Sequence, residues 1–144
     1  MSKFIKYFLL GTLFWVIVDY TTVFNPDFPR WVAHMPLVWV FYLGYPLLFA
    51  WLIYKQNFAG KKLFFSMIIA TVFCELIAFQ NTLLYTFPIM LIMIPLAVCI
   101  YTLITYVPMW LVNGKLKQHW RLSLFLTIVW LLIAFLNYKT NIAG

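Results

Sequence analysis

The sequence predicts an all-α integral membrane protein, a bundle of about five transmembrane helices with the N-terminus inside and the C-terminus outside. Of its 144 residues, 66% are hydrophobic and only 9% are charged. The apolar residues fall in runs of roughly 20, the length that a helix needs to cross the hydrocarbon core of a bilayer. Eight of the ten basic residues lie in alternate connections between these runs, and this bias sets the orientation of membrane proteins.

The first predicted span covers residues 4–24, and the second covers residues 32–54. The first ends at residues 25–29, where two prolines and an asparagine break the helix and favour a turn. The apolar run before it resembles a signal peptide, but bulky residues follow Asp19 and no small-residue cleavage site is present. We therefore expect an uncleaved first helix. The second span ends at the polar stretch 55–57.

The remaining predicted spans cover residues 63–86, 88–112 and 120–138. Pro88 suits the first turn of the fourth span, because a proline there loses no hydrogen bond. Only Phe87 separates the third and fourth spans, so the two are expected to form a tight antiparallel hairpin. The fourth span ends before Asn113 and Gly114. Residues 1–144 then form a single transmembrane domain without a soluble appendage.

The basic residues define one face of the membrane. Positive charge gathers before the first span, between the second and third, and between the fourth and fifth. The net charge of +7 therefore indicates topology and not a nucleic-acid partner. The expected surroundings are a lipid bilayer, of a prokaryotic-type plasma membrane, with the chain itself or other membrane subunits as further partners. The basic residues on the inner face are Lys3, Lys6, Lys55, Lys61, Lys62, Lys115, Lys117 and Arg121.

Two of the three acidic residues lie inside predicted spans, each 13 residues beyond a lysine of the inner face. Asp19 follows Lys6 and Glu75 follows Lys62 at this distance. At about 1.5 Å per residue, both acids lie roughly 20 Å into the membrane, toward the outer leaflet. A charged group is costly at this depth, so an intramembrane acid is a candidate functional residue.

Counting back from the basic connections places further polar residues at the same depth. Tyr42 lies 13 residues before Lys55, and Thr102 lies 13 residues before Lys115. On a continuous third helix, Thr71 shares a polar stripe with Glu75, and a stripe of small and polar residues is expected to face other helices. His34 lies near the outer face. The predicted binding residues are Glu75, Asp19, Asn81, Tyr42, Thr102, Thr71 and His34, with Tyr45 and Tyr101 nearby.

Three interpretations of the two acids remain open. Asp19 and Glu75 line a shared polar cavity that binds a cation, a proton or a cationic group, in which case two close carboxylates would hold one proton between them. Alternatively, each acid only forms hydrogen bonds between helices. In the third interpretation Asp19 lies at the outer interface, and His34 is likewise an interfacial histidine.

The leading functional hypothesis is binding or translocation of a small solute, ion or proton through this intramembrane carboxylate site. The alternatives are a non-catalytic subunit of a larger membrane complex and, third, a lipid-modifying enzyme. The sequence favours a non-enzymatic role, because it contains none of the common hydrolase, zinc or phosphate-binding motifs. Cys74 and Cys99 have no metal-ligand spacing and are expected to be small buried hydrophobic residues. No metal site is predicted, and the sequence assigns no cofactor.

Overall fold

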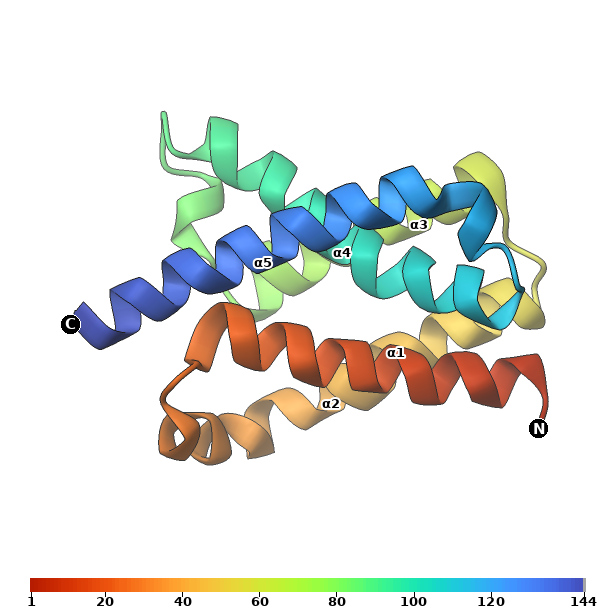
Figure 1. Cartoon of the computed structure of the whole chain (residues 1–144), viewed down its shortest axis with the longest axis horizontal. Helices are drawn as coiled ribbons and strands as arrows, with labels where there is room; N and C mark the ends of the chain where they lie inside the picture. Colours follow the sequence, from red (N-terminus) through yellow and green to blue (C-terminus); the bar gives the residue numbers. More distant parts are fainter. Residues whose placement is uncertain (144) are drawn as a thin grey trace.

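The computed structural model describes residues 1–143, which contain helices and no strands. Successive long helices run in opposite directions (Figure 1). The helices are α1 (Lys3–Asp19), continued by the π-helical segment η1 (Tyr20–Phe24); α2 (Phe28–Tyr54); α3 (Gly60–Val72), continued by the π-helical segment η2 (Phe73–Ala78); α4 (Met90–Val112); and α5 (Trp120–Ala143). Two short 3-10 turns, η3 (Thr82–Leu84) and η4 (Leu116–His119), lie in the connections.

Four helical segments are long and apolar enough to cross a membrane: residues 3–24, 28–54, 90–112 and 116–143. They correspond to the first, second, fourth and fifth predicted spans. Helix α2 begins at Phe28, four residues before the predicted start. Its first turn contains Pro29, and Asp27 caps it by accepting a hydrogen bond from the Arg30 backbone N–H at 3.0 Å.

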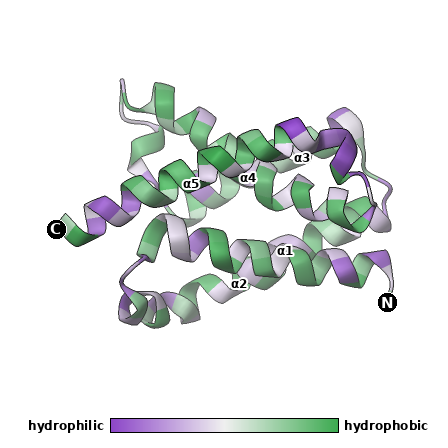
Figure 2. Cartoon of the chain, in the orientation of Figure 1, coloured by the Kyte–Doolittle hydropathy of each residue, from purple (hydrophilic) through white to green (hydrophobic). Residues whose placement is uncertain are grey.

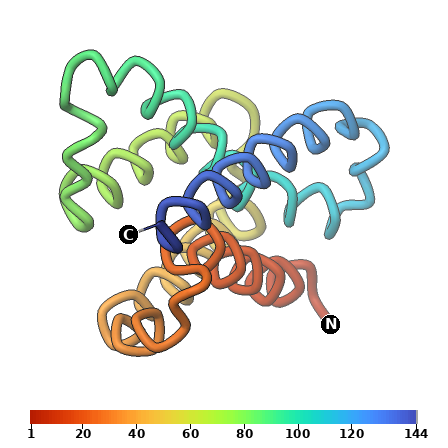
Figure 3. Tube along the Cα trace, turned by 60° about the vertical axis from the view of Figure 1, so that its left-hand side comes forward, coloured from red at the N-terminus to blue at the C-terminus, as the bar shows by residue number. Residues whose placement is uncertain are grey.

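The third predicted span differs most from the structure. The helix that starts at Gly60 ends at Ala78 and does not continue to residue 86. Gln80 has a φ of 51°, in the left-handed region that ends helices, and the Asn81 N–H then donates to the Glu75 carbonyl oxygen at 2.8 Å. The tight hairpin expected at Phe87 is therefore replaced by a longer connection, which extends away from the other helices (Figure 3).

The N-terminus and two of the connections bring eight of the ten basic residues to one end of the bundle. The N-terminus, the α2–α3 connection and the α4–α5 connection lie together at the right of Figure 1, and the α1–α2 turn and the C-terminus lie at the left. Figure 2 shows the helices as mostly hydrophobic along their middles, with hydrophilic residues gathered toward the ends. This arrangement is the one that the charge pattern predicts for antiparallel membrane helices.

The core lies where α1 packs against α2 and α4. The buried residues of α1 recur every three or four positions, at Tyr7, Gly11, Trp15 and Val18, which places them on one face of the helix. Gly11 lies against Pro46 of α2, and a Cβ atom at Gly11 would lie only 2.9 Å from the Pro46 Cβ. Glycine therefore permits the close approach of the two helices.

Buried hydroxyl groups join α1, α2 and α4 inside this core. The Tyr7 hydroxyl donates to the Thr105 carbonyl oxygen at 2.9 Å, and the hydroxyls of Tyr45 and Thr105 form a hydrogen bond of 2.6 Å. All three side chains are buried. These bonds satisfy buried polar groups that water does not reach, and they hold the three helices together.

We expect Thr105→Val to destabilise the bundle by about 1 kcal/mol, because valine keeps the volume and leaves the Tyr45 hydroxyl without its partner. Thr102→Val is the matched control, since the Thr102 hydroxyl donates only to the Val98 carbonyl oxygen of its own helix. Unfolding curves in mixed detergent measure both variants. Equal losses in the two would contradict a role for the Tyr45–Thr105 bond between helices.

Helix α5 lies at the edge of the bundle, against α4 and η1. Leu126 is the only buried residue of its described part, Trp120–Ala143. Its exposed face carries large apolar side chains such as Phe125, Leu132 and Phe135, each more than half exposed. Such a surface suits lipid and not water, in agreement with the apolar composition.

Candidate functional site

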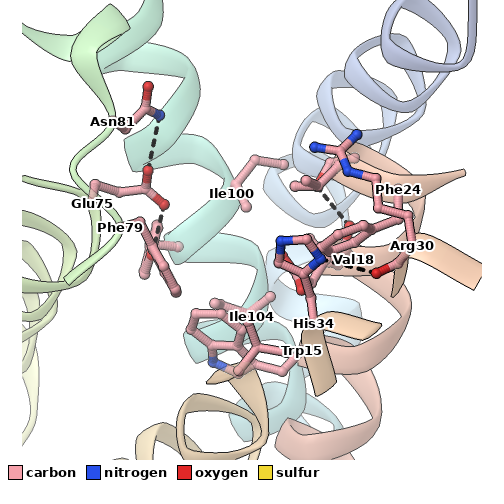
Figure 4. Close-up of a pocket in the computed structure, with 15 residues that line it drawn as sticks. Trp15, Val18, Phe24, Arg30, His34, Glu75, Phe79, Asn81, Ile100 and Ile104 are labelled. Carbon is pink, nitrogen blue, oxygen red and sulfur yellow. Dashed lines mark hydrogen bonds between the residues drawn. The ribbon is translucent and has the colours of Figure 1, made fainter. Parts of the chain in front are cut away.

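A cavity of about 330 Å³ lies among the ends of α1, α2 and η2 and the middle of α4 (Figure 4). Asp19 and Glu75 both line it, although the two residues come from different helices. Most of the surrounding side chains are apolar or aromatic. The lining residues are Trp15, Val18, Asp19, Thr22, Val23, Phe24, Arg30, His34, Val38, Glu75, Phe79, Asn81, Ile100, Tyr101 and Ile104.

Asp19 is the last residue of α1 and is held by a relay of hydrogen bonds from α2. The Tyr42 hydroxyl donates to an Asp19 carboxylate oxygen at 2.5 Å, and the Trp31 indole N–H donates to the Tyr42 hydroxyl oxygen at 3.1 Å. Both donors come from one face of α2, eleven residues apart. The relay fixes one oxygen of the carboxylate, and no hydrogen bond to the other was found within residues 1–143.

Glu75 lies in η2 and receives one donor on each carboxylate oxygen. The Tyr101 hydroxyl of α4 donates to Oε1 at 2.8 Å, and the Asn81 side-chain amide donates to Oε2 at 3.0 Å. Asn81 reaches Glu75 because the chain reverses at Gln80 directly after the helix. Figure 4 shows the Glu75 carboxylate between its partners at one side of the cavity.

Each acid lies at a π-helical segment. Asp19 directly precedes η1, and Glu75 is the third residue of η2. A π turn contains one more residue than an α turn, and such turns are frequent at functional sites. In η1 the hydroxyls of Thr21 and Thr22 donate to the carbonyl oxygens of Ile17 and Val18, at 2.7 Å each, and so satisfy backbone groups of the widened turn.

Aromatic rings form the floor and sides of the cavity. Trp15 packs edge-on against Tyr101, with ring centroids 5.7 Å apart, and against Tyr45 at 5.2 Å. Phe24 and Phe79 line other parts of the wall. Tyr101 thus has two roles, since its ring forms part of the wall and its hydroxyl holds Glu75.

Arg30 is the one lysine or arginine among the residues that line the cavity. Its guanidinium group lies over the Phe24 ring, 5.5 Å from the centroid, and the side chain is exposed. His34 stands one helical turn further along α2, where its Nδ1–H donates to the Arg30 carbonyl oxygen at 2.9 Å.

The structure places the predicted residues in two groups. Asp19, Glu75, Asn81 and His34 line the cavity, and Tyr42 holds Asp19 from behind. Thr71 and Thr102 do not line it. Their hydroxyls donate to carbonyl oxygens one turn earlier in their own helices, of Met67 and Val98.

The residues that complete the wall were not predicted from the sequence, chiefly Trp15, Phe24 and Arg30. Trp15 precedes Asp19 by one helical turn, and this spacing is the signal that places it on the same face. Tyr101 is adjacent to Thr102, so the depth count found the correct layer of α4 but the wrong neighbour. Within residues 1–143, no group of three or more His, Cys, Asp or Glu side chains is arranged to hold a metal ion.

Comparisons with protein families, curated proteins and solved structures found no match to this chain.

Proposed function

We propose that this chain is a multi-pass membrane protein that binds a small monovalent cation, or the cationic group of a small solute, in the cavity between Asp19 and Glu75. The observation that carries the proposal is that two acids from separate helices line one apolar cavity. Intramembrane acids face cavities, pair with partners and mark substrate or ion pathways. Translocation of the bound cation is part of the proposal.

The charges of the cavity favour a ligand with one positive charge. Two carboxylates are opposed by one guanidinium group, that of Arg30, so the ionised site has an excess of one negative charge. A buried charge without a counter-charge is costly, and a bound monovalent cation would remove this cost.

The aromatic walls favour an organic ammonium group over a bare metal ion. Trp15, Phe24, Phe79 and Tyr101 line the cavity, and the face of an aromatic ring attracts a cation by about 2 kcal/mol when both are desolvated. Metal cations are bound instead by several oxygen ligands at short distance. The proposed ligand is therefore a small amine or quaternary ammonium compound.

The proposed orientation has the basic connections in the cytoplasm and the cavity nearer the outer face. Eight of the ten basic residues lie at the end of the bundle remote from the α1–α2 turn, and this turn adjoins the cavity through Phe24 and Arg30. Under the positive-inside rule, the N-terminus is then inside a plasma membrane and the C-terminus is outside.

Equilibrium binding of radiolabelled tetramethylammonium to the protein in lipid nanodiscs tests the proposal. We expect wild type to bind it and the double variant Asp19→Asn/Glu75→Gln to bind it roughly 30-fold more weakly or worse, as when one partner of a buried charge pair is removed. The matched control is Asp27→Asn, which alters the third acid, outside the cavity. Absence of binding by wild type, or equal binding by wild type and the double variant, would refute the proposal.

A further inference from the structure

A second cavity, of about 350 Å³, adjoins the first between α4, α5 and the end of η1. Glu75 and Tyr101 line both cavities, so the acid stands at their junction. The two cavities therefore offer adjoining volumes on either side of one carboxylate. The residues common to both are Thr22, Val23, Glu75, Asn81, Ile100 and Tyr101.

The second cavity differs from the first in its chemistry. Asp19 and Arg30 line only the first cavity, and no lysine, arginine or histidine of residues 1–143 lines the second. Away from the junction, two polar residues of α5, Asn137 and Thr140, line the second cavity, and the other lining side chains are apolar. The apolar ones are Leu84, Met93, Leu96, Ala97, Ile133 and Leu136.

We propose that the ligand is an amphiphilic cation, with its ammonium group between Asp19 and Glu75 and its alkyl chain in the second cavity between α4 and α5. This inference rests on the proposed function and assigns a substrate class to it. The cation belongs in the first cavity, because both acids and the aromatic rings lie there. The alkyl chain belongs in the second, because most side chains that line it away from the junction are apolar and gain dispersion contacts from an apolar occupant.

The position of the second cavity agrees with a ligand that arrives from the bilayer. The cavity lies between two helices at the edge of the bundle, and most of α5 is exposed on its other faces. Lipid tails and the side chains of Leu96 and Ile133 are similarly apolar environments for an alkyl chain. Moving the chain of an amphiphile sideways from the bilayer into the cavity therefore costs little free energy. Its ammonium group then gains the electrostatic attraction of the Asp19 and Glu75 carboxylates.

A cavity-filling variant tests the inference. Ala97→Trp places an indole ring in the second cavity and leaves Asp19 and Glu75 unchanged. The probes are tetramethylammonium and octyltrimethylammonium, whose binding to the protein is measured in phosphatidylcholine nanodiscs at matched bilayer-bound concentration. We expect Ala97→Trp to weaken octyltrimethylammonium binding about tenfold or more, as overpacking does, and to leave tetramethylammonium binding within about twofold.

Leu91→Trp is the matched control, because Leu91 lies on the same helix, is 63% exposed and lines neither cavity. Equal binding of octyltrimethylammonium by wild type and Ala97→Trp would overturn the inference, and so would an equal loss in Leu91→Trp. Ile133→Trp fills the same cavity from α5 and replaces Ala97→Trp if that variant does not fold.

The two proposals fail in different ways. If tetramethylammonium binds and depends on the acids, but both cavity-filling variants bind the long chain normally, only the inference about the alkyl chain is wrong. If wild type binds neither probe, the proposed cation site itself is wrong. If only octyltrimethylammonium binds, the proposed cation site is wrong, and the inference that rests on it is overturned as well.

Discussion

Glu75→Gln is expected to weaken tetramethylammonium binding roughly 30-fold or more, the factor that corresponds to about 2 kcal/mol. The substitution removes the charge and keeps the shape of the side chain. The glutamine carbonyl oxygen can still accept the hydrogen bond from the Tyr101 hydroxyl, whereas the bond from the Asn81 amide is lost, because the glutamine NH2 group cannot accept it. Binding in nanodiscs and thermal unfolding are measured on the same preparation, which separates the loss of a ligand partner from the loss of structure.

Glu75→Asp is the control that keeps the charge. Its carboxylate is one methylene shorter, so we expect weaker binding than in wild type but stronger binding than in Glu75→Gln. If Glu75→Gln binds as wild type does, or if the two variants lose binding equally, the charge of Glu75 does not hold the ligand. Asp19 is expected to matter less, because it lines only the first cavity and Glu75 lines both.

Gly11→Leu is expected to destabilise the bundle by about 3 kcal/mol, because it overfills a close contact between α1 and α2. The first added atom already meets the Pro46 Cβ at 2.9 Å, and Pro46 is a rigid, fully buried ring that has no other rotamer to adopt. The helices must therefore separate, and Tyr7 and Trp15, on the same face of α1, lose contacts as well.

Gly44→Leu is the matched control for this prediction. Gly44 lies in α2, and a Cβ atom added there meets nothing within 4 Å, so we expect a change within about 0.5 kcal/mol, as for exposed substitutions. Unfolding in a detergent series is measured for both variants. A stable Gly11→Leu protein, or equal losses at the two glycines, would show that α1 and α2 do not depend on this contact.

Four helices and their directions could be predicted from hydropathy, turn residues and basic charge, because each signal is local. The end of α3 could not. Residues 79–86 lie between two apolar runs and contain no proline or glycine, the residues that most often end a helix. Hydropathy does not indicate the reversal at Gln80, after which Asn81 donates to Glu75 from both its backbone N–H and its side-chain amide.

The level of each site residue along the bundle could be predicted better than the side chains that lie next to it. A constant rise per residue places Asp19 and Glu75 in one layer, and the cavity contains both. The depth of a residue does not determine the direction in which its side chain points around the helix axis, however. Thr102 was selected where Tyr101 faces Glu75, and the hydroxyls of Thr71 and Thr102 are satisfied within their own helices, as threonine hydroxyls in helices commonly are.

The π-helical segments beside Asp19 and Glu75 change the angular phase of their helices. The side chains before a π turn and those after it do not follow one regular helical periodicity. The two parts of each helix therefore direct their side chains toward different surroundings. In α1 the earlier part packs the core through Tyr7 and Trp15, and Trp15 also lines the cavity, whereas the later part, with Thr22 and Phe24, forms a further part of the wall. The part of the wall formed by η1 can therefore diverge in sequence without disturbing the helix crossing that supports it.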